Sequence, residues 1–197
     1  MSERLSGRQV VMIVANEFED IELLYPLLRL SEEGAGIVVV PVQMGLHPRP
    51  SLAEKPVTGR FGHPVPIPVM PEGRRHRIGR IEELDAARID CLLFPGGFSP
   101  DSLRRHQQTL ELVRQCHREK RLLAAICHAP WILISAGVMA GKRATAFASL
   151  RDDLVNAGAE FVDAPVVRDG HVITSRMPND LPEFCQEIIT ALCEKAA

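Results

Sequence analysis

Short apolar runs recur along the chain and alternate with segments of helical spacing. The runs at 9–15, 37–42, 90–94 and 122–126 are almost entirely apolar over the length of a strand. A strand that is apolar on both of its faces is typical of a parallel sheet covered by helices on both sides. We therefore predict parallel strands at these places, and a further strand at 171–175.

The segments between the runs carry apolar residues at the spacing of a helix. Ile21, Leu24, Tyr25 and Leu28 follow the i, i+3, i+4, i+7 pattern. A longer stripe lies near the end of the chain and comprises Leu181, Phe184, Cys185, Ile188, Ile189, Leu192 and Cys193. Strands that alternate with helices predict an α/β fold, in which a parallel sheet carries helices on both faces. The length of 197 residues suits a single domain over 1–197, since no linker or repeat divides the chain.

The stretch 45–80 breaks this alternation because it is rich in proline, glycine and arginine. Val65, Ile67 and Val69 alternate with prolines, which allows only an edge strand or an extended surface segment. We expect the basic cluster at 74–77 to be a solvated loop, and contact with an anion or with another subunit is the alternative.

Composition and charge narrow the possible partners. Hydrophobic residues make up 46% of the chain and the formal net charge is −2, so we expect neither nucleic acid nor a membrane surface as the main partner. No apolar run approaches the length of a membrane span, and the first residues do not resemble a signal peptide. The five cysteines are odd in number and unclustered, which favours a reduced, cytoplasmic location.

Cys127 lies where the apolar run 122–126 meets a helical pattern that begins near Pro130. A cysteine on such a turn is exposed at the carboxyl edge of the sheet, and the helix terminus favours its thiolate. This position predicts an activated nucleophile. The alternative is a cysteine that packs as a small apolar residue in the core.

Three of the predicted strands end in polar or glycine residues. These are the segments 16–19, Gly96–Gly97 and Cys127–His128. Because the carboxyl ends of parallel strands meet at one edge, a carboxylate, paired backbone donors and a thiol are expected in one crevice. Such groups can form a thiol-nucleophile site with an oxyanion hole. The histidines show no metal-ligand spacing, so we expect no catalytic metal, and no nucleotide-binding glycine motif occurs.

At these residues the sequence resembles the PfpI family of the ThiJ/PfpI superfamily, which comprises intracellular cysteine peptidases and glyoxalase- or deglycase-type enzymes. The matching stretches are ANEFEDIELLYP, TGRFGHPVPI, LLFPGGFSPDSLRR, AAICHAPWILISAGV, RDDLVNAGAEFVDAPVVRDG and TSRMPNDLPEF. They follow one another over nearly the whole chain. The resemblance implies a flavodoxin-like, class I glutamine amidotransferase-like fold without a metal or an organic cofactor.

The resemblance also assigns roles to single residues. It implies that Cys127 is the nucleophile on a strained turn and that His128 is the general base or acid. Glu19 falls where the family places a protonated carboxyl group that touches the thiol. The backbone N–H groups of Gly97 and His128 would bind the oxyanion. The family's partner for the histidine comes from a neighbouring subunit, at the position of Asp101, where Glu is frequent in the family. A homo-oligomer is therefore expected, as a dimer, trimer or hexamer.

Some positions depart from the family pattern. Phe147 stands where the family often has Tyr, and Ala129 where many members have Gly, while Gly96 is the first of the paired glycines at the pocket. The regions 47–56 and 74–80 are expanded relative to compact members. These differences are expected to affect the pocket mouth or the subunit interface.

Three functions remain open on the sequence alone. The first is thiol chemistry on small 2-oxoaldehydes or their adducts, of the glyoxalase or deglycase type. The second is an intracellular peptidase or amidase, and the third is a non-enzymatic redox sensor or stress chaperone. Any of them predicts an unfavourable backbone conformation at Cys127 and a carboxyl oxygen of Glu19 within hydrogen-bond distance of its sulfur.

Overall fold

The computed structural model describes residues 3–44, 55–68, 70–73 and 75–194. Most of the expanded region 47–56, and Arg74 of the basic cluster, lie outside the described residues.

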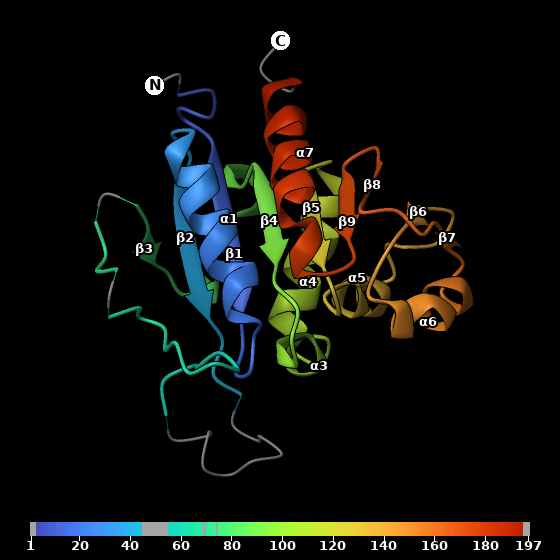
Figure 1. The fold of residues 1–197 in the computed structure, drawn as a ribbon, viewed down its shortest axis with the longest axis horizontal. Helices are drawn as coiled ribbons and strands as arrows, with labels where there is room; N and C mark the ends of the chain where they lie inside the picture. The colour runs from blue at the N-terminus through green and yellow to red at the C-terminus, as the bar shows by residue number, and fades with distance from the viewer. Residues whose placement is uncertain (1–2, 45–54, 69, 74, 195–197) are drawn as a thin grey trace.

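A seven-stranded sheet forms the centre of the molecule (Figure 1), in the order β3-β2-β1-β4-β5-β9-β8. All neighbouring strands are parallel except β8 and β9, which form an antiparallel hairpin. The strands are β1 (Gln9–Val14), β2 (Gly36–Pro41), β3 (Arg77–Ile78), β4 (Cys91–Phe94), β5 (Leu122–Ile126), β8 (Val166–Asp169) and β9 (Val172–Ser175). The predicted α/β fold with a mostly parallel sheet is thereby confirmed.

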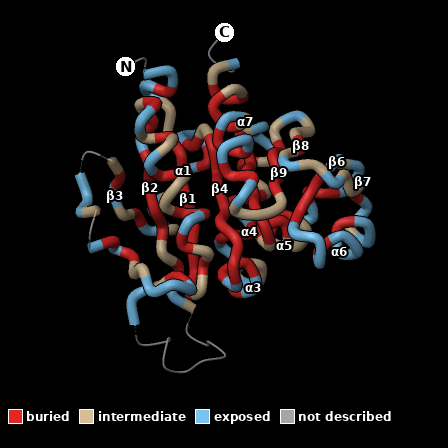
Figure 2. Tube along the Cα trace, in the orientation of Figure 1, coloured by how far each residue is buried: buried red, intermediate tan, exposed pale blue. Residues whose placement is uncertain are grey.

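Helices cover both faces of this sheet, and Figure 1 shows α1 and α7 in front of it. The helices are α1 (Asp20–Glu32), α3 (Ser99–Leu103), α4 (Gln107–Arg118), α5 (Pro130–Ala136), α6 (Arg151–Asn156) and α7 (Leu181–Glu194). Successive residues of β1 belong to different cores: Met12 packs with α1 and α7, and Ile13 packs with α4 and α5. Figure 2 shows that the central strands are buried along their lengths, which explains their unbroken apolar runs.

The structure differs from the sequence-based prediction at two segments. The sequence also predicts a short strand at 144–147, but only β6 (Arg143–Ala144) forms there, and it pairs with β7 (Glu160–Phe161) outside the main sheet. Part of the expected basic loop forms β3, which is an edge strand beside β2. Neither short strand has the long apolar run from which the others were recognised.

The register of the sheet brings three chain segments together at one edge. Met12 lies opposite Leu93, and Phe94 lies opposite Ala125, so β1, β4 and β5 end at neighbouring points. The segment after β1 then forms an isolated antiparallel bridge with the segment after β4, between Phe18 and Gly97. The turn at Cys127 follows β5 directly, so it lies at the same edge.

Candidate active site

Cys127 occupies the turn between β5 and α5 with a positive φ of 63°. Left-handed backbone is rare for a residue with a side chain, and it marks a strained position that the surroundings must hold. Two backbone hydrogen bonds do so: the N–H of Cys127 donates to the carbonyl of Ser175 at 3.0 Å, and its carbonyl accepts from Phe147 N–H at 3.0 Å. The predicted unfavourable conformation at Cys127 is confirmed.

The carboxyl group beside the sulfur belongs to Glu22, in the first turn of α1. Glu22 is fully buried and lies close enough to Cys127 for each group to shift the pKa of the other, while its Oε1 has no hydrogen-bond partner among the described residues. Its Oε2 also accepts a hydrogen bond of 2.7 Å from the backbone N–H of Gly96. Through these contacts the carboxyl group joins the segment after β4 to the turn after β5.

The prediction that Glu19 touches the sulfur is wrong. Glu19 precedes α1 as its N-cap residue, and its Oε2 accepts from Nη1 of Arg60 at 3.2 Å. The helix begins at Asp20, so Glu22 lies almost one turn further along it, against the core. The segment after β1 contains several carboxylate side chains, and the residue at which α1 begins determines which of them lies beside the thiol.

Burial controls the protonation of this pair. It raises the pKa of Glu22 to about 8, against the lowering effect of the Gly96 N–H, so this carboxyl group is mainly neutral at pH 7. Burial also raises the pKa of the Cys127 thiol to about 12, and the negative charge of an ionised Glu22 adds to this rise. That direction contradicts the thiolate predicted from the helix terminus alone, which took no account of burial. A neutral Glu22 removes its own charge from the pair and can donate a hydrogen bond to a forming thiolate.

Two backbone N–H groups oppose the effect of burial on the pKa of the Cys127 thiol. The backbone N–H groups of Gly97 and His128 lower the pKa of the Cys127 thiol. Gly97 has a φ of 71°, and a Cβ there would overlap the backbone of Glu17 and Phe18. A Cβ on Gly96 would lie 2.7 Å from the Cβ of Cys127. Both glycines are therefore required for the close approach of this loop to the sulfur.

His128 lies next to the sulfur, with its Nδ1 3.2 Å from Sγ of Cys127. The ring stacks on Phe147 at a centroid distance of 4.9 Å and meets the edge of Trp131 at 5.4 Å. Burial, and then the charge of Arg60, lower the pKa of His128 below its usual value. A neutral imidazole at this distance can accept the thiol proton. Ala129 follows as the fully buried N-cap of α5.

Arg60 is a residue of this site that the sequence did not single out. Besides its ion pair with Glu19, its guanidinium lies 5.4 Å from the centroid of the exposed Phe98 ring. Its charge also lowers the pKa of Glu22 and His128. The turn that carries it is fixed by Asp20, whose carboxylate accepts from the N–H groups of Phe61 and His63 at 2.9 and 3.1 Å.

Asp101 is exposed on α3, where its carboxylate forms a long ion pair with Arg105, 3.9 Å between Oδ2 and Nη2. Within a single chain, the described residues give it no hydrogen bond or ion pair with His128. Its expected role as a partner from a neighbouring subunit stays a prediction.

Neither a metal-binding cluster nor a membrane-spanning helix is present among the described residues. Among them, no group of three or more His, Cys, Asp or Glu side chains is arranged to hold a metal ion. No helix in the same part of the chain has the length and apolar character needed to cross a membrane.

Comparison with known proteins gives relatives that match over nearly the full length. The family model described as the DJ-1/PfpI family matches residues 8–191. Deglycase PfpI of Pyrococcus furiosus is 35% identical over 184 residues, which cover 93% of this chain and 99% of that protein. The putative cysteine protease YraA of Bacillus subtilis is 36% identical over 186 residues, covering 94% and 99%. The crystal structure of Drosophila melanogaster DJ-1beta superimposes with a TM-score of 0.77 at 26% identity, covering 98% of this chain and 91% of that one.

Proposed function

Because the chain belongs to the DJ-1/PfpI family, we propose that it is a cysteine-dependent enzyme of the glyoxalase or deglycase type, acting on small 2-oxoaldehydes or their adducts. One arrangement carries this proposal: the Cys127 thiol lies between a buried, neutral Glu22 and the Nδ1 of His128. These groups provide a nucleophile, a proton donor and a proton acceptor within one crevice.

The first step is addition of the sulfur to the aldehyde carbon. His128 accepts the thiol proton as the S–C bond forms, and the electron pair of the C=O bond moves to the oxygen. The N–H groups of Gly97 and His128 face the sulfur and can stabilise that oxygen as it gains charge. Return of the proton to the oxygen gives a hemithioacetal at Cys127.

The second step moves a proton between the two carbons of the substrate. The ionised form of Glu22 takes the proton from the former aldehyde carbon, and its neutral form returns a proton to the neighbouring carbon. A carboxyl group with a pKa of about 8 is suited to both tasks near neutral pH. The product is a thioester of a 2-hydroxy acid, which water hydrolyses to release the acid and restore the thiol.

The surroundings of the sulfur favour a small substrate. Cys127 is 8% exposed, and Phe147 and Trp131 pack against the adjacent His128. An extended peptide needs several contacts along a groove, whereas a 2-oxoaldehyde needs access to one atom. In the deglycase version the substrate is the hemiaminal or hemithioacetal of the same aldehyde. Its C–N or C–S bond breaks, the hydroxyl proton passes to the leaving amine or thiol, and the freed aldehyde then follows the same steps.

A second candidate is the peptidase or amidase function, which the name of the Bacillus subtilis relative suggests. In that reaction Cys127 attacks an amide carbonyl and His128 protonates the leaving amine. The third candidate is a non-enzymatic redox role, because a sulfur beside a hydrogen-bonding carboxyl group can be oxidised selectively. All three need a reduced Cys127, and no disulfide joins any of the five cysteines.

The deciding experiment measures lactate formation from methylglyoxal and cleavage of fluorogenic peptides by the wild type and Cys127→Ser. Cys193→Ser is a matched control, because Cys193 lies on α7, away from the site. The proposal expects lactate formation that is lost in Cys127→Ser and retained in Cys193→Ser. Peptide cleavage alone would support the second candidate. Oxidation of Cys127 without turnover of either substrate would support the third. Both of these outcomes contradict the proposal.

We further propose that the active site is completed in a homo-oligomer, with the partner subunit's Asp101 beside His128. Asp101 is exposed and has only a distant ion pair within its own chain, so its carboxylate is available to a neighbour. A carboxylate near the imidazole would stabilise the imidazolium that forms when His128 accepts the thiol proton.

A further inference from the structure

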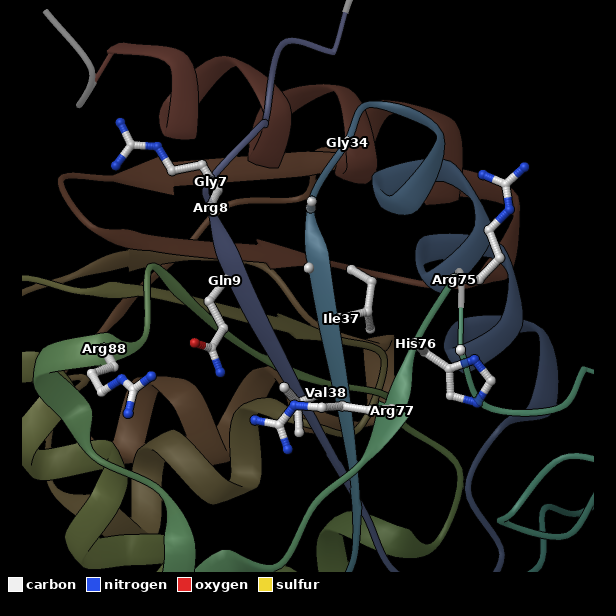
Figure 3. A pocket seen from close by; sticks show the side chains of 13 residues that line it. Gly7, Arg8, Gln9, Gly34, Ile37, Val38, Arg75, His76, Arg77 and Arg88 are labelled. Atoms are coloured by element: carbon white, nitrogen blue, oxygen red, sulfur yellow. The ribbon is translucent and has the colours of Figure 1, made fainter.

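A second cavity lies at the opposite edge of the sheet from Cys127, where β1 and β2 begin. Its volume is about 550 Å³, within the range of small-molecule pockets. Figure 3 shows the side chains around it, which come from the starts of both strands, from the edge strand β3 and from the short helix at 86–88. Small residues form much of its wall, namely Gly7, Gly34, Ala35, Gly36 and Gly73.

The charged side chains that line this cavity are all arginines: Arg8, Arg75, Arg77 and Arg88. Arg8 is neutralised by Asp90, with 3.1 Å between Nη1 and Oδ1. The other three form no ion pair with any residue that the structure describes. In Figure 3 the side chains of Arg77 and Arg88 lie on the same side as the amide of Gln9. The cavity therefore holds uncompensated positive charge next to a neutral polar group.

His76 adds a separate observation. This residue lines the same cavity and is only 2% exposed, yet neither of its ring nitrogens has a hydrogen-bond partner among the described residues. Burial lowers the pKa of His76 below its usual value, against the opposite effect of the nearby Glu72, so the ring is neutral and offers one donor and one acceptor. Leaving a buried polar group without a partner costs stability. Both ring nitrogens are sealed from the cavity as the ring stands, so a ligand reaches them only when the ring turns toward it.

We propose that this cavity binds a small phosphate-bearing anion. Guanidinium groups match the geometry of phosphate oxygens and can bind them through paired hydrogen bonds. Arg77 and Arg88 supply the charge beside Gln9, while Arg75 and His76 line the cavity from the other side of β2 (Figure 3). The volume exceeds that of a single phosphate, so the ligand is a diphosphate or an organic phosphate.

The site is separate from the thiol. β1 runs from Gln9 at this cavity to Val14 near the active-site edge, and its six residues span about 20 Å. Phosphate binding is therefore expected to be the same in Cys127→Ser as in the wild type.

Isothermal titration with inorganic diphosphate and with ribose 5-phosphate tests this proposal, with sulfate at equal ionic strength as the reference anion. We expect saturable binding of one phosphate ligand per chain, and a stronger signal for one of the two ligands identifies its chemical source. The double variant Arg77→Gln/Arg88→Gln should weaken that binding by about tenfold or more. The matched control Arg118→Gln/Arg143→Gln removes the same charge outside the cavity and should change the affinity less than about twofold. Absence of saturable binding, or equal losses in the two double variants, would overturn the proposal.

His76→Phe gives an independent test, because it keeps the aromatic bulk and removes both ring nitrogens. If the ring nitrogens of His76 serve ligand binding and not folding, their removal should leave the melting temperature equal to or above that of the wild type. The affinity for the phosphate probe should become weaker. An unchanged affinity in a folded His76→Phe protein would contradict the contribution of His76 to phosphate binding. Should this variant fail to fold, the arginine variants still decide the question.

Discussion

The carboxyl group of Glu22 lies beside the thiol of Cys127 at the edge of the sheet, and both residues are buried. The first turn of α1 provides the acid, and the strained turn after β5 provides the sulfur. Neither group is in its ordinary protonation range, because burial raises both pKa values. The reactivity of the thiol therefore depends on a carboxyl group that lies about half the length of the chain away from it in the sequence.

The first prediction concerns stability and pH. Glu22 has a folded-state pKa of about 8, above its value in the unfolded chain, so the folded state holds an extra proton between about pH 4.5 and 8. Its stabilising contribution is present at low pH and is lost as the pH rises through this window, at up to about 1.4 kcal/mol per pH unit. The free energy of unfolding of the wild type, minus that of Glu22→Gln, should fall from pH 5 to pH 8 in urea titrations.

Glu19→Gln is the control for that experiment. Glu19 is the neighbouring acid, and it is paired with Arg60 and is less buried. The difference in free energy of unfolding between the wild type and Glu19→Gln should change less over this pH range than the difference for Glu22→Gln. A flat curve for Glu22→Gln would mean that Glu22 is ionised in the folded protein.

The second prediction concerns Arg60. Its charge lowers the pKa of His128, so Arg60→Gln should raise that pKa and move the acidic limb of the kcat/KM profile to higher pH. At pH 7 a smaller fraction of His128 would be neutral, and kcat/KM should fall by less than about tenfold because Arg60 is partly exposed. The pH dependence of methylglyoxal turnover measures this shift. Arg80→Gln, which loses a weak ion pair with Glu82, should leave the profile in place.

The third prediction concerns Gly96. A methyl group on this residue would lie 2.7 Å from the Cβ of Cys127 and 2.8 Å from Oε2 of Glu22, and backbone of β5 limits relaxation. Gly96→Ala should destabilise the fold by about 1–3 kcal/mol and lower turnover strongly. Gly141→Ala is a useful comparison, because Gly141 has open space around its Cα and only its positive φ of 72° opposes a side chain. Gly141→Ala should therefore retain turnover, and equal losses of turnover in both variants would count against the close approach at Gly96.

The fourth prediction concerns Asp101 in an oligomer. If the partner's Asp101 completes the site, Asp101→Asn and Cys127→Ser should each be impaired alone. Mixed oligomers contain sites with neither defect, so subunit exchange between the two variants should restore activity above that of either parent. Restoration would be absent if Asp101 acts within its own chain, or if it has no part in the reaction.

Much of the fold could be predicted from the sequence because the central strands are buried on both faces. The apolar runs that became β1 and β5 are long enough to be read without knowledge of their neighbours. β3 was not predicted, and the strand predicted at 144–147 is longer than β6, because β3 and β6 each have two residues and depend on an adjacent strand. Cys127 was recognisable because its turn is local: an apolar run ends, and a helix with an early proline follows.

The identity of the acid could not be predicted from local pattern. Glu17, Glu19 and Glu22 lie within one short segment, and only the start of α1 and the packing against β4 select Glu22. The apolar spacing predicted the wrong face of this helix, because Ile21 and Leu28 are exposed whereas Glu22, Leu23 and Leu27 are buried. The pKa of Cys127 was also misjudged, because burial is a property of the folded chain and outweighed the local effect of the helix terminus.

The most direct test of the account compares kcat for methylglyoxal in Glu22→Gln and Glu19→Gln. Gln keeps the size of the side chain and can donate a hydrogen bond, but it cannot relay a proton. We predict that Glu22→Gln lowers kcat by about 100-fold or more, the usual contribution of a general acid or base, with little change in KM. Glu19→Gln should lower kcat by less than about tenfold. A larger loss in Glu19→Gln than in Glu22→Gln would contradict the assignment of Glu22 as the acid that serves Cys127.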